Sequence, residues 1–297
     1  MHIVWSLIAL FTLGLAPTVH ALCESDKSAC VAALTKHTSL HDGPNCFNAA
    51  LVAAGLMDEI VYVDSLEYAF YLEFFCQAQP KNRNAAGNVL VYLGIEPSPL
   101  LMAEENIQIL HGAYSLGSGK ILEKTSNAGS LFGKNEGRER AGVYQIKPLP
   151  QSAFATKESG TKSMMGYRCL PPTEVAKQIA VLNADPLAQQ MFNLRIQFTQ
   201  KLQTQPLSKI TGLAEQLKLI RAALKNRKGN SKIDLYLAAL SRSLVGTIET
   251  VVDEDNANYD EEIKSELREF LSTSFELVEK VNTKTNFSKT KPLLLKY

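Results

Sequence analysis

The 297-residue sequence predicts an α+β fold, in which helices and an antiparallel sheet come first and an all-helical bundle follows. Residues 44–76 carry apolar side chains at helical spacing. Residues 87–149 consist of short runs rich in β-branched and aromatic residues, separated by glycines. Residues 173–281 return to long amphipathic segments. Because strands and helices are segregated along the chain, we expect an antiparallel sheet.

Residues 1–21 have the composition of a secretory signal peptide. Their apolar core, residues 3–16, contains no charged side chain, and small residues precede the expected cleavage point. The core is too short and too interrupted to predict a membrane span. Leu22, directly before Cys23, disfavours a lipid anchor. We therefore expect a periplasmic or secreted protein with no stable membrane span after cleavage.

Length and charge bound the rest of the chain. It is long enough for one large domain or two modest ones, and we divide it into residues 22–170, a helical domain of residues 171–283 and a loose tail of residues 284–297. The 31 Lys and Arg residues nearly balance the 30 Asp and Glu residues, so there is no electrostatic case for a nucleic-acid partner.

Cys46 falls in the first turn of the first predicted helix. Pro44 suits the first helical position, Asp42 or Gly43 can cap it, and Gly55 is a natural stop. A thiol at this end of a helix lies in the positive field of the helix dipole, which favours the reactive thiolate. The pattern alone fits a nucleophile and a structural cysteine equally well. A second helix is predicted over residues 64–76.

The cysteine count leaves one thiol to explain. An exported protein can keep disulfides, and five cysteines cannot all be paired. The simplest arrangement joins Cys23 to Cys30 and Cys76 to Cys169 and leaves Cys46 free, although other pairings remain open. No C-x-x-C motif or nearby histidine has zinc-ligand spacing, so we expect no metal and no cofactor.

The strand-rich region predicts a strand over residues 87–94, a hairpin and a further strand over residues 142–149. The hairpin consists of residues 107–116, a turn at residues 117–119, and residues 120–126.

His111 lies inside the first hairpin strand, followed by the small residues Gly112 and Ala113. Small neighbours leave room for another element to pack closely, and the Cys46 helix is the candidate. A cysteine and a histidine on separate elements can hold a thiolate–imidazolium pair and later protonate a leaving amine. The alternative is a structural histidine on a strand face.

Three sequence blocks support the pairing. They are NCFNAAL at residues 45–51, GNVLVYLG at residues 87–94 and HGAYSLGSGKILEKTS at residues 111–126. In this order they resemble the NlpC-type peptidases of the papain-like cysteine hydrolase superfamily. The resemblance covers about residues 41–150. It implies a papain-like domain in which Cys46 is the nucleophile, His111 the base and Glu123 the third catalytic residue, with a peptide or peptidoglycan-like substrate.

The chain departs from that family pattern at three positions. Asn45 precedes the cysteine where Asp is common, Asn88 replaces an Asp, and Glu123 stands where His, Asn or Gln is usual. A carboxylate at position 123 can accept the imidazole N–H and fix the tautomer that faces the thiol. The alternative is a solvent-facing strand residue beside Lys124.

Two further sets of groups are candidates for substrate contacts. The backbone N–H of Cys46 and the side chain of Asn45 are candidate oxyanion donors. In residues 132–140, Arg138 and Arg140 are candidates for binding a substrate carboxylate. A solvated loop is the alternative for this segment.

The C-terminal half predicts a bundle of amphipathic helices. The acidic residues 253–262 fail the EF-hand pattern and are expected to form an interhelical loop. The predicted helices span residues 173–182, 186–203, 206–226, 231–252 and 260–281.

These observations predict an exported cysteine hydrolase that cleaves a peptide or amide bond, and the resemblance implies cell-wall peptides as the substrate class. The alternative is an inactive papain-like domain that serves as a binding or scaffold protein. The same dyad would also serve an acyltransferase.

Overall fold

The computed structural model describes residues 45–95, 107–124, 144–152, 161–201, 212–229, 231–255 and 261–284, together with Asp26, Ala29, Cys30 and Ala32. The predicted signal peptide, Cys23, the segment with Arg138 and Arg140, and residues 285–297 of the predicted tail lie outside these residues. The described part of the chain is an α+β structure with a six-stranded antiparallel sheet and seven α-helices, as predicted.

The sheet has the strand order β1-β6-β2-β3-β4-β5, and every neighbouring pair is antiparallel. The predicted hairpin is confirmed as β3 and β4, and its turn places Gly117, Ser118 and Gly119 at φ values of 77°, 50° and 71°. A short 3-10 helix, Leu149–Gln151, directly follows β5. The strands are β1 (Cys76–Ala78), β2 (Asn88–Ile95), β3 (Ile107–Gly117), β4 (Lys120–Lys124), β5 (Tyr144–Pro148) and β6 (Thr161–Cys169).

Two of these strands were not predicted from the sequence. β6 lies between β1 and β2, although it follows β2 by more than sixty residues. Its sequence, TKSMMGYRC, has only a short period-two pattern, Met165, Tyr167 and Cys169, and it contains Gly166. That glycine is required because a Cβ there would lie 2.2 Å from the carbonyl oxygen of Arg83.

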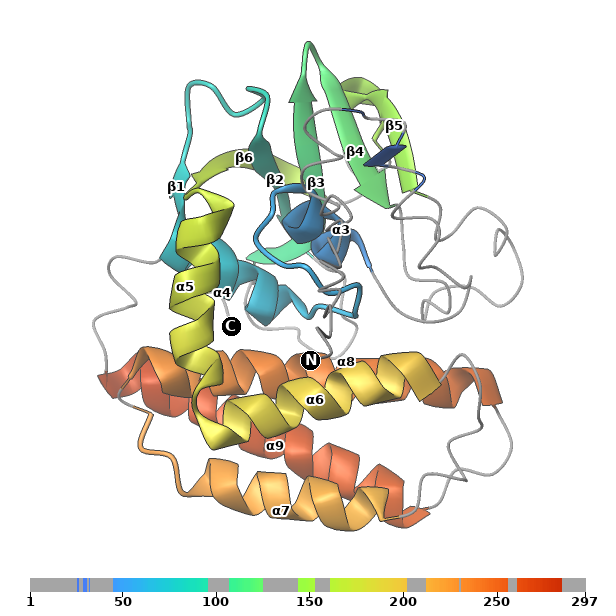
Figure 1. Cartoon of the computed structure of the whole chain (residues 1–297), viewed down its shortest axis with the longest axis vertical. Coiled ribbons are helices and arrows are strands. Elements are labelled where there is room, and N and C mark those ends of the chain that lie inside the picture. The colour runs from blue at the N-terminus through green and yellow to red at the C-terminus, as the bar shows by residue number, and fades with distance from the viewer. Residues whose placement is uncertain are drawn as a thin grey trace, which may run out of the picture.

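Helices α3 (Cys46–Ala53) and α4 (Ser65–Phe75) connect the sheet to the rest of the molecule (Figure 1). α3 packs on β3 and β4. It begins at Cys46 rather than at Pro44, because the side chain of Asn45 accepts the N–H of Asn48 and caps the helix.

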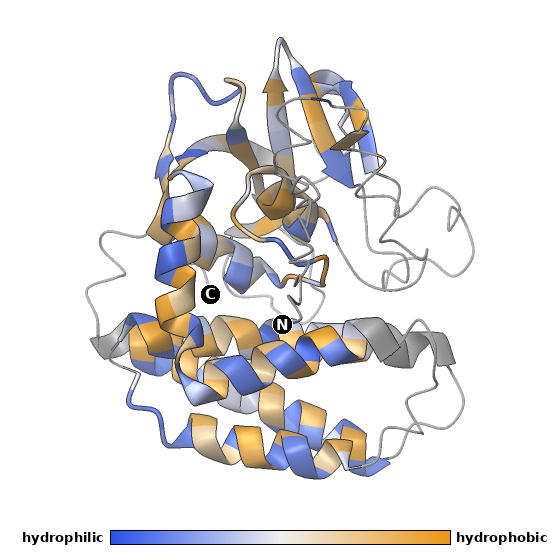
Figure 2. Ribbon diagram, viewed as in Figure 1, coloured by the Kyte–Doolittle hydropathy of each residue, from blue (hydrophilic) through white to orange (hydrophobic). Residues whose placement is uncertain are grey.

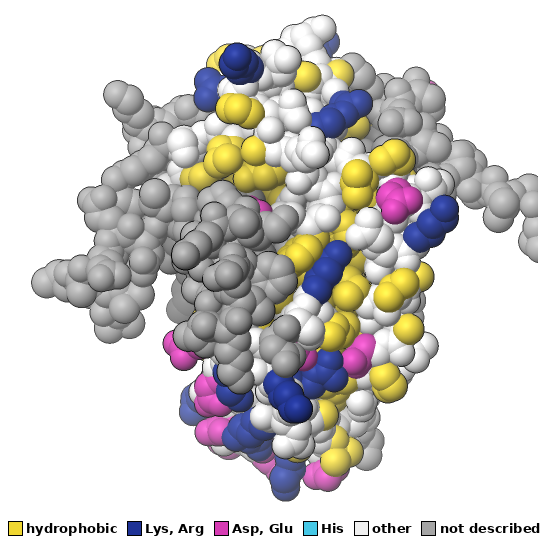
Figure 3. Space-filling model, turned by 90° about the vertical axis from the view of Figure 1, so that its left-hand side faces the viewer, with side chains coloured by type: hydrophobic (Ala, Val, Ile, Leu, Met, Phe, Trp, Pro, Cys, Tyr) yellow, Lys and Arg dark blue, Asp and Glu magenta, His cyan; other side chains and the backbone are white. Residues whose placement is uncertain are grey.

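The C-terminal half contains the five predicted helices, and all pack below the sheet in the view of Figure 1 except α5, which rises beside α4. α7 starts at Leu213, later than predicted, with Gly212 at φ 77° as its cap. Their apolar stripes turn inward (Figure 2). On the face shown in Figure 3, charges of both signs mingle over the lower part of the molecule. The helices are α5 (Pro172–Asn183), α6 (Pro186–Lys201), α7 (Leu213–Lys225), α8 (Lys232–Asp255) and α9 (Glu261–Lys284).

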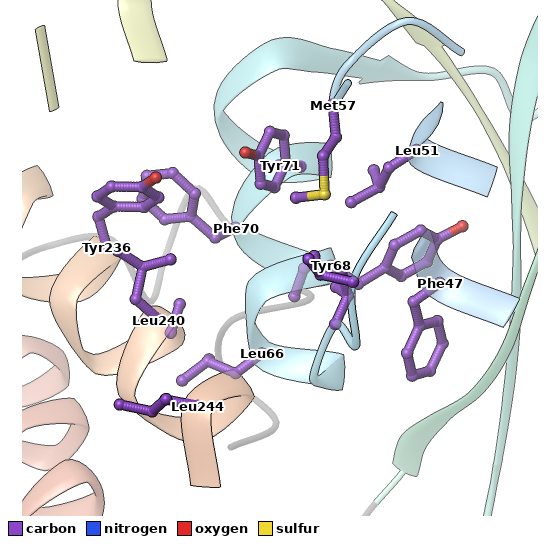
Figure 4. Close-up of a cluster of buried hydrophobic side chains, with 14 of the residues drawn as sticks. Phe47, Leu51, Met57, Leu66, Tyr68, Phe70, Tyr71, Tyr236, Leu240 and Leu244 are labelled. Atoms are coloured by element: carbon purple, nitrogen blue, oxygen red, sulfur yellow. The ribbon is translucent and has the colours of Figure 1, made fainter. Parts of the chain in front are cut away.

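The two halves share one hydrophobic core. α8 packs directly on α4, where Tyr236 and Leu240 lie beside Phe70 and Leu66 (Figure 4). The rings of Phe70 and Tyr236 are 5.2 Å apart. Within the described residues, no helix is both long and apolar enough to cross a bilayer.

Candidate functional site

Cys46 is the first residue of α3, and its thiol is not part of a disulfide. The side chain is 9% exposed. The preceding Asn45 is fixed at both ends of its amide: Oδ1 accepts the N–H of Asn48 at 3.1 Å, and Nδ2 donates to the carbonyl oxygen of Val63 at 2.6 Å. The amide of Asn45 is therefore engaged in holding the start of α3, which leaves its predicted role as an oxyanion donor without support.

His111, on β3, contacts Glu123 and interacts with the charge of Cys46. Its Nε2 atom lies 3.0 Å from Oε2 of Glu123. Burial of the ring lowers its pKa, but the negative charges of Cys46 and Glu123 raise it more, to about 9. The site therefore favours an imidazolium beside the sulfur.

Glu123, on β4, is completely buried, which excludes the alternative of a solvent-facing strand residue. Besides His111 it contacts two residues that the sequence did not single out. Ser152 donates its hydroxyl to Oε2 at 2.7 Å, and Nζ of Lys147 lies 2.5 Å from Oε1. Burial raises the pKa of Glu123, but His111, Lys147 and Ser152 together lower it to about 2. These three contacts therefore keep the buried carboxylate of Glu123 ionised.

Lys147 and Ser152 do not belong to the β3–β4 hairpin. Lys147 lies on β5, which pairs with β4, and Ser152 follows the short 3-10 helix. The ring of Tyr92, on β2, lies beside His111, with the two ring centroids 5.4 Å apart. No sequence motif marks these residues, because their approach to Glu123 depends on how β5 pairs with β4.

Lys124, at the end of β4, is a buried cation that the sequence did not single out. Its side chain is 3% exposed, and its Nζ atom lies 5.6 Å from the centre of the Tyr144 ring. Burial lowers its pKa to about 8, and the negative charge of Cys46 opposes this shift. Lys124 is therefore close enough to Cys46 for the two charges to interact.

Gly112 explains how α3 and α4 approach the His111 strand so closely. A Cβ at this position would lie 2.7 Å from the hydroxyl of Tyr68 and 3.1 Å from the ring of Phe47. These two rings stack at 4.7 Å (Figure 4), and the Tyr68 hydroxyl donates to the carbonyl oxygen of Leu90 at 2.9 Å. The small residue predicted to admit the Cys46 helix does so.

The disulfide predicted between Cys76 and Cys169 is present, where the two residues face each other in the β1–β6 ladder. It is consistent with an exported protein. Cys30 is also disulfide-bonded, and Cys23, its predicted partner, lies outside the described residues. Within the described part of the chain, no three His, Cys, Asp or Glu side chains are grouped as metal ligands.

The site thus consists of a free thiol, a buried imidazole and a buried carboxylate, supported by Ser152 and Lys147. Arg138 and Arg140 lie outside the described residues, so their proposed contact with substrate stays a prediction. In comparisons with known proteins, no family model, curated protein or solved structure matches the chain.

Proposed function

We propose that this protein is an exported cysteine hydrolase of papain-like, NlpC-type architecture that cleaves an amide bond in a peptide or peptidoglycan-like substrate. The observation that carries the proposal is the buried His111, whose Nε2 atom lies 3.0 Å from Oε2 of Glu123 and whose ring interacts with the charge of Cys46. A nucleophile, a base and a residue that orients the base are the three parts that thiol-dependent acyl transfer requires.

Each residue has a defined task in this reaction. The thiolate of Cys46 attacks the carbonyl carbon, and the electron pair of the C=O bond moves to the oxygen. The N–H of Cys46 lies in the first turn of α3, where the helix leaves such donors unsatisfied, and it donates to that oxygen. The oxygen then re-forms its double bond, the C–N bond breaks, and His111 gives its proton to the departing amine.

The second half of the reaction releases the acyl group. Neutral His111 accepts a proton from water, which attacks the thioester carbon, and collapse of this intermediate frees the acid and returns the thiolate with the imidazolium. Glu123 keeps the imidazole in one orientation throughout and stabilises its positive charge. Because both side chains are buried, this interaction is screened little by water or salt.

The proposal is tested by incubating the purified protein with peptide amides and with peptidoglycan stem peptides, and by detecting released amines and acylated Cys46 by mass spectrometry. We expect Cys46→Ala to abolish both signals. Glu266→Gln is the control, because Glu266 pairs with Arg221 in the helical bundle, away from the site. Full amide cleavage by Cys46→Ala would refute the proposal. Adding hydroxylamine as an acceptor separates hydrolysis from acyl transfer.

A further inference from the structure

Among the described residues, Lys124 is a buried charged side chain near Cys46 that the proposed reaction leaves without a task. It ends β4, directly after Glu123, and α3 packs on this strand. Its side chain is almost completely buried, and it shares a face of β4 with Leu122, which lies in one buried cluster with Cys46. The interaction of its charge with that of Cys46 agrees with this placement. A buried ammonium is unfavourable unless negative charge lies near it. The protonated form of Lys124 is therefore favoured whenever negative charge is present at Cys46 or on an atom bonded to it.

The proposed reaction creates such a charge. When Sγ of Cys46 bonds to the carbonyl carbon, the negative charge moves from the sulfur to the neighbouring oxygen. An oxyanion of this kind is usually held by two donors. The N–H of Cys46 provides one, and the amide of Asn45 is engaged with Asn48 and Val63. A second group is needed at the site.

We propose that the ammonium of Lys124 is the second oxyanion-stabilising group of this site. The inference rests on the function proposed above. As the S–C bond forms and the carbonyl π pair moves to oxygen, Lys124 donates a hydrogen bond to that oxygen and keeps its own proton. The electron pair returns when the leaving group departs. Because the surroundings are dry, a full positive charge stabilises the oxyanion more strongly here than it would in water.

Two reagents of known structure separate this role from a general effect on the thiol. p-Nitrophenyl acetate acylates Cys46 through a tetrahedral oxyanion, whereas iodoacetamide alkylates it by displacement of iodide and forms no oxyanion. Both reactions need the thiolate, so the ratio of the acylation rate to the alkylation rate cancels changes in thiolate population. We expect Lys124→Met to lower this ratio by about 10²–10³-fold. Lys124→Arg, which keeps the charge and the donors, retains most of it.

Lys120→Met is the matched control, because Lys120 lies on the same strand and is exposed. We expect it to keep the wild-type ratio. Lys124→Gln provides a second neutral variant if the methionine variant does not fold, as judged by circular dichroism. A wild-type ratio in a folded neutral variant would overturn the role of Lys124, including the case in which both rates fall equally. A wild-type Cys46 that reacts with neither reagent would instead contradict the proposed function.

Discussion

Nε2 of His111 and Oε2 of Glu123 lie 3.0 Å apart, and both side chains are completely buried. They come from the two strands of one hairpin, whose tight turn fixes their relative position. A buried charged pair needs further hydrogen bonds to be favourable. Ser152 and Lys147 supply these to the carboxylate, and the charge of Cys46 stabilises the imidazolium. The arrangement fixes both the orientation and the charge of the imidazole.

Glu123→Gln should lower the pKa of His111 from about 9, because the charge that stabilises the imidazolium is removed. The ring proton signals of His111 in an NMR titration report this directly. We also expect acylation of Cys46 to slow by at least about tenfold, since the base is less well oriented. Glu266→Gln, the same substitution in the bundle, should leave the titration unchanged. A His111 titration that is the same in wild type and Glu123→Gln would contradict this role.

Glu123 should also make the unfolding free energy of the protein depend on pH. Its pKa is about 2 in the folded protein and near 4.5 when unperturbed, so its contribution is complete above pH 4.5 and is lost as the pH falls through 2. The shift corresponds to about 3 kcal/mol. Urea denaturation gives the difference in unfolding free energy between the wild type and Glu123→Gln. This difference should shrink as the pH is lowered from about 5 to about 2.5, the range over which the pKa of Glu123 is shifted. A constant difference over this range would disprove the assignment.

Gly112→Ala should destabilise the protein by about 1–3 kcal/mol, because the new methyl group overlaps the hydroxyl of Tyr68. Relief of this overlap requires α3 and α4 to move away from β3, which separates Cys46 from His111. We therefore expect slower alkylation of Cys46 together with the loss of stability. Urea denaturation and the iodoacetamide rate measure the two effects. Wild-type values of both would show that the contact is less tight than the structure indicates.

A buried ion pair between α4 and α6 should contribute to the free energy of unfolding of the protein. Arg195 of α6 lies 2.5 Å from Glu67 of α4, and Ser243 of α8 donates to the same carboxylate oxygen. Arg195→Met leaves Glu67 as a buried charge without its cation, which should cost about 3–5 kcal/mol. The double variant Arg195→Met/Glu67→Leu should cost less than the single one. Urea denaturation of the single and double variants tests this. A double variant at least as unstable as the single would contradict it.

Much of the fold could be predicted from local patterns. The hairpin follows from its glycine turn, and the helices of the C-terminal half follow from their apolar stripes. β6 could not be predicted, because its place in the sheet depends on distant partners in β1 and β2 rather than on its own sequence. The alternation of Met165, Tyr167 and Cys169 is too short to predict a central strand by itself.

In the candidate site too, some residues could be predicted from local sequence patterns and others could not. The positions of Cys46, His111 and Glu123 agree with blocks that can be read along the chain. Lys124 looked like an ordinary surface lysine, since lysine is rarely buried. Its burial comes from the packing of α3 over β4, which no local pattern encodes.

The rate at which iodoacetamide alkylates Cys46 at one fixed pH, compared between the wild type and His111→Gln, tests the central pairing most directly. The thiolate is the reactive form of a cysteine, and an imidazolium beside the sulfur stabilises it. We expect Cys46 to react at least about tenfold faster in the wild type than in His111→Gln. Equal rates in the two proteins would contradict the thiolate–imidazolium pair and the hydrolase proposed from it.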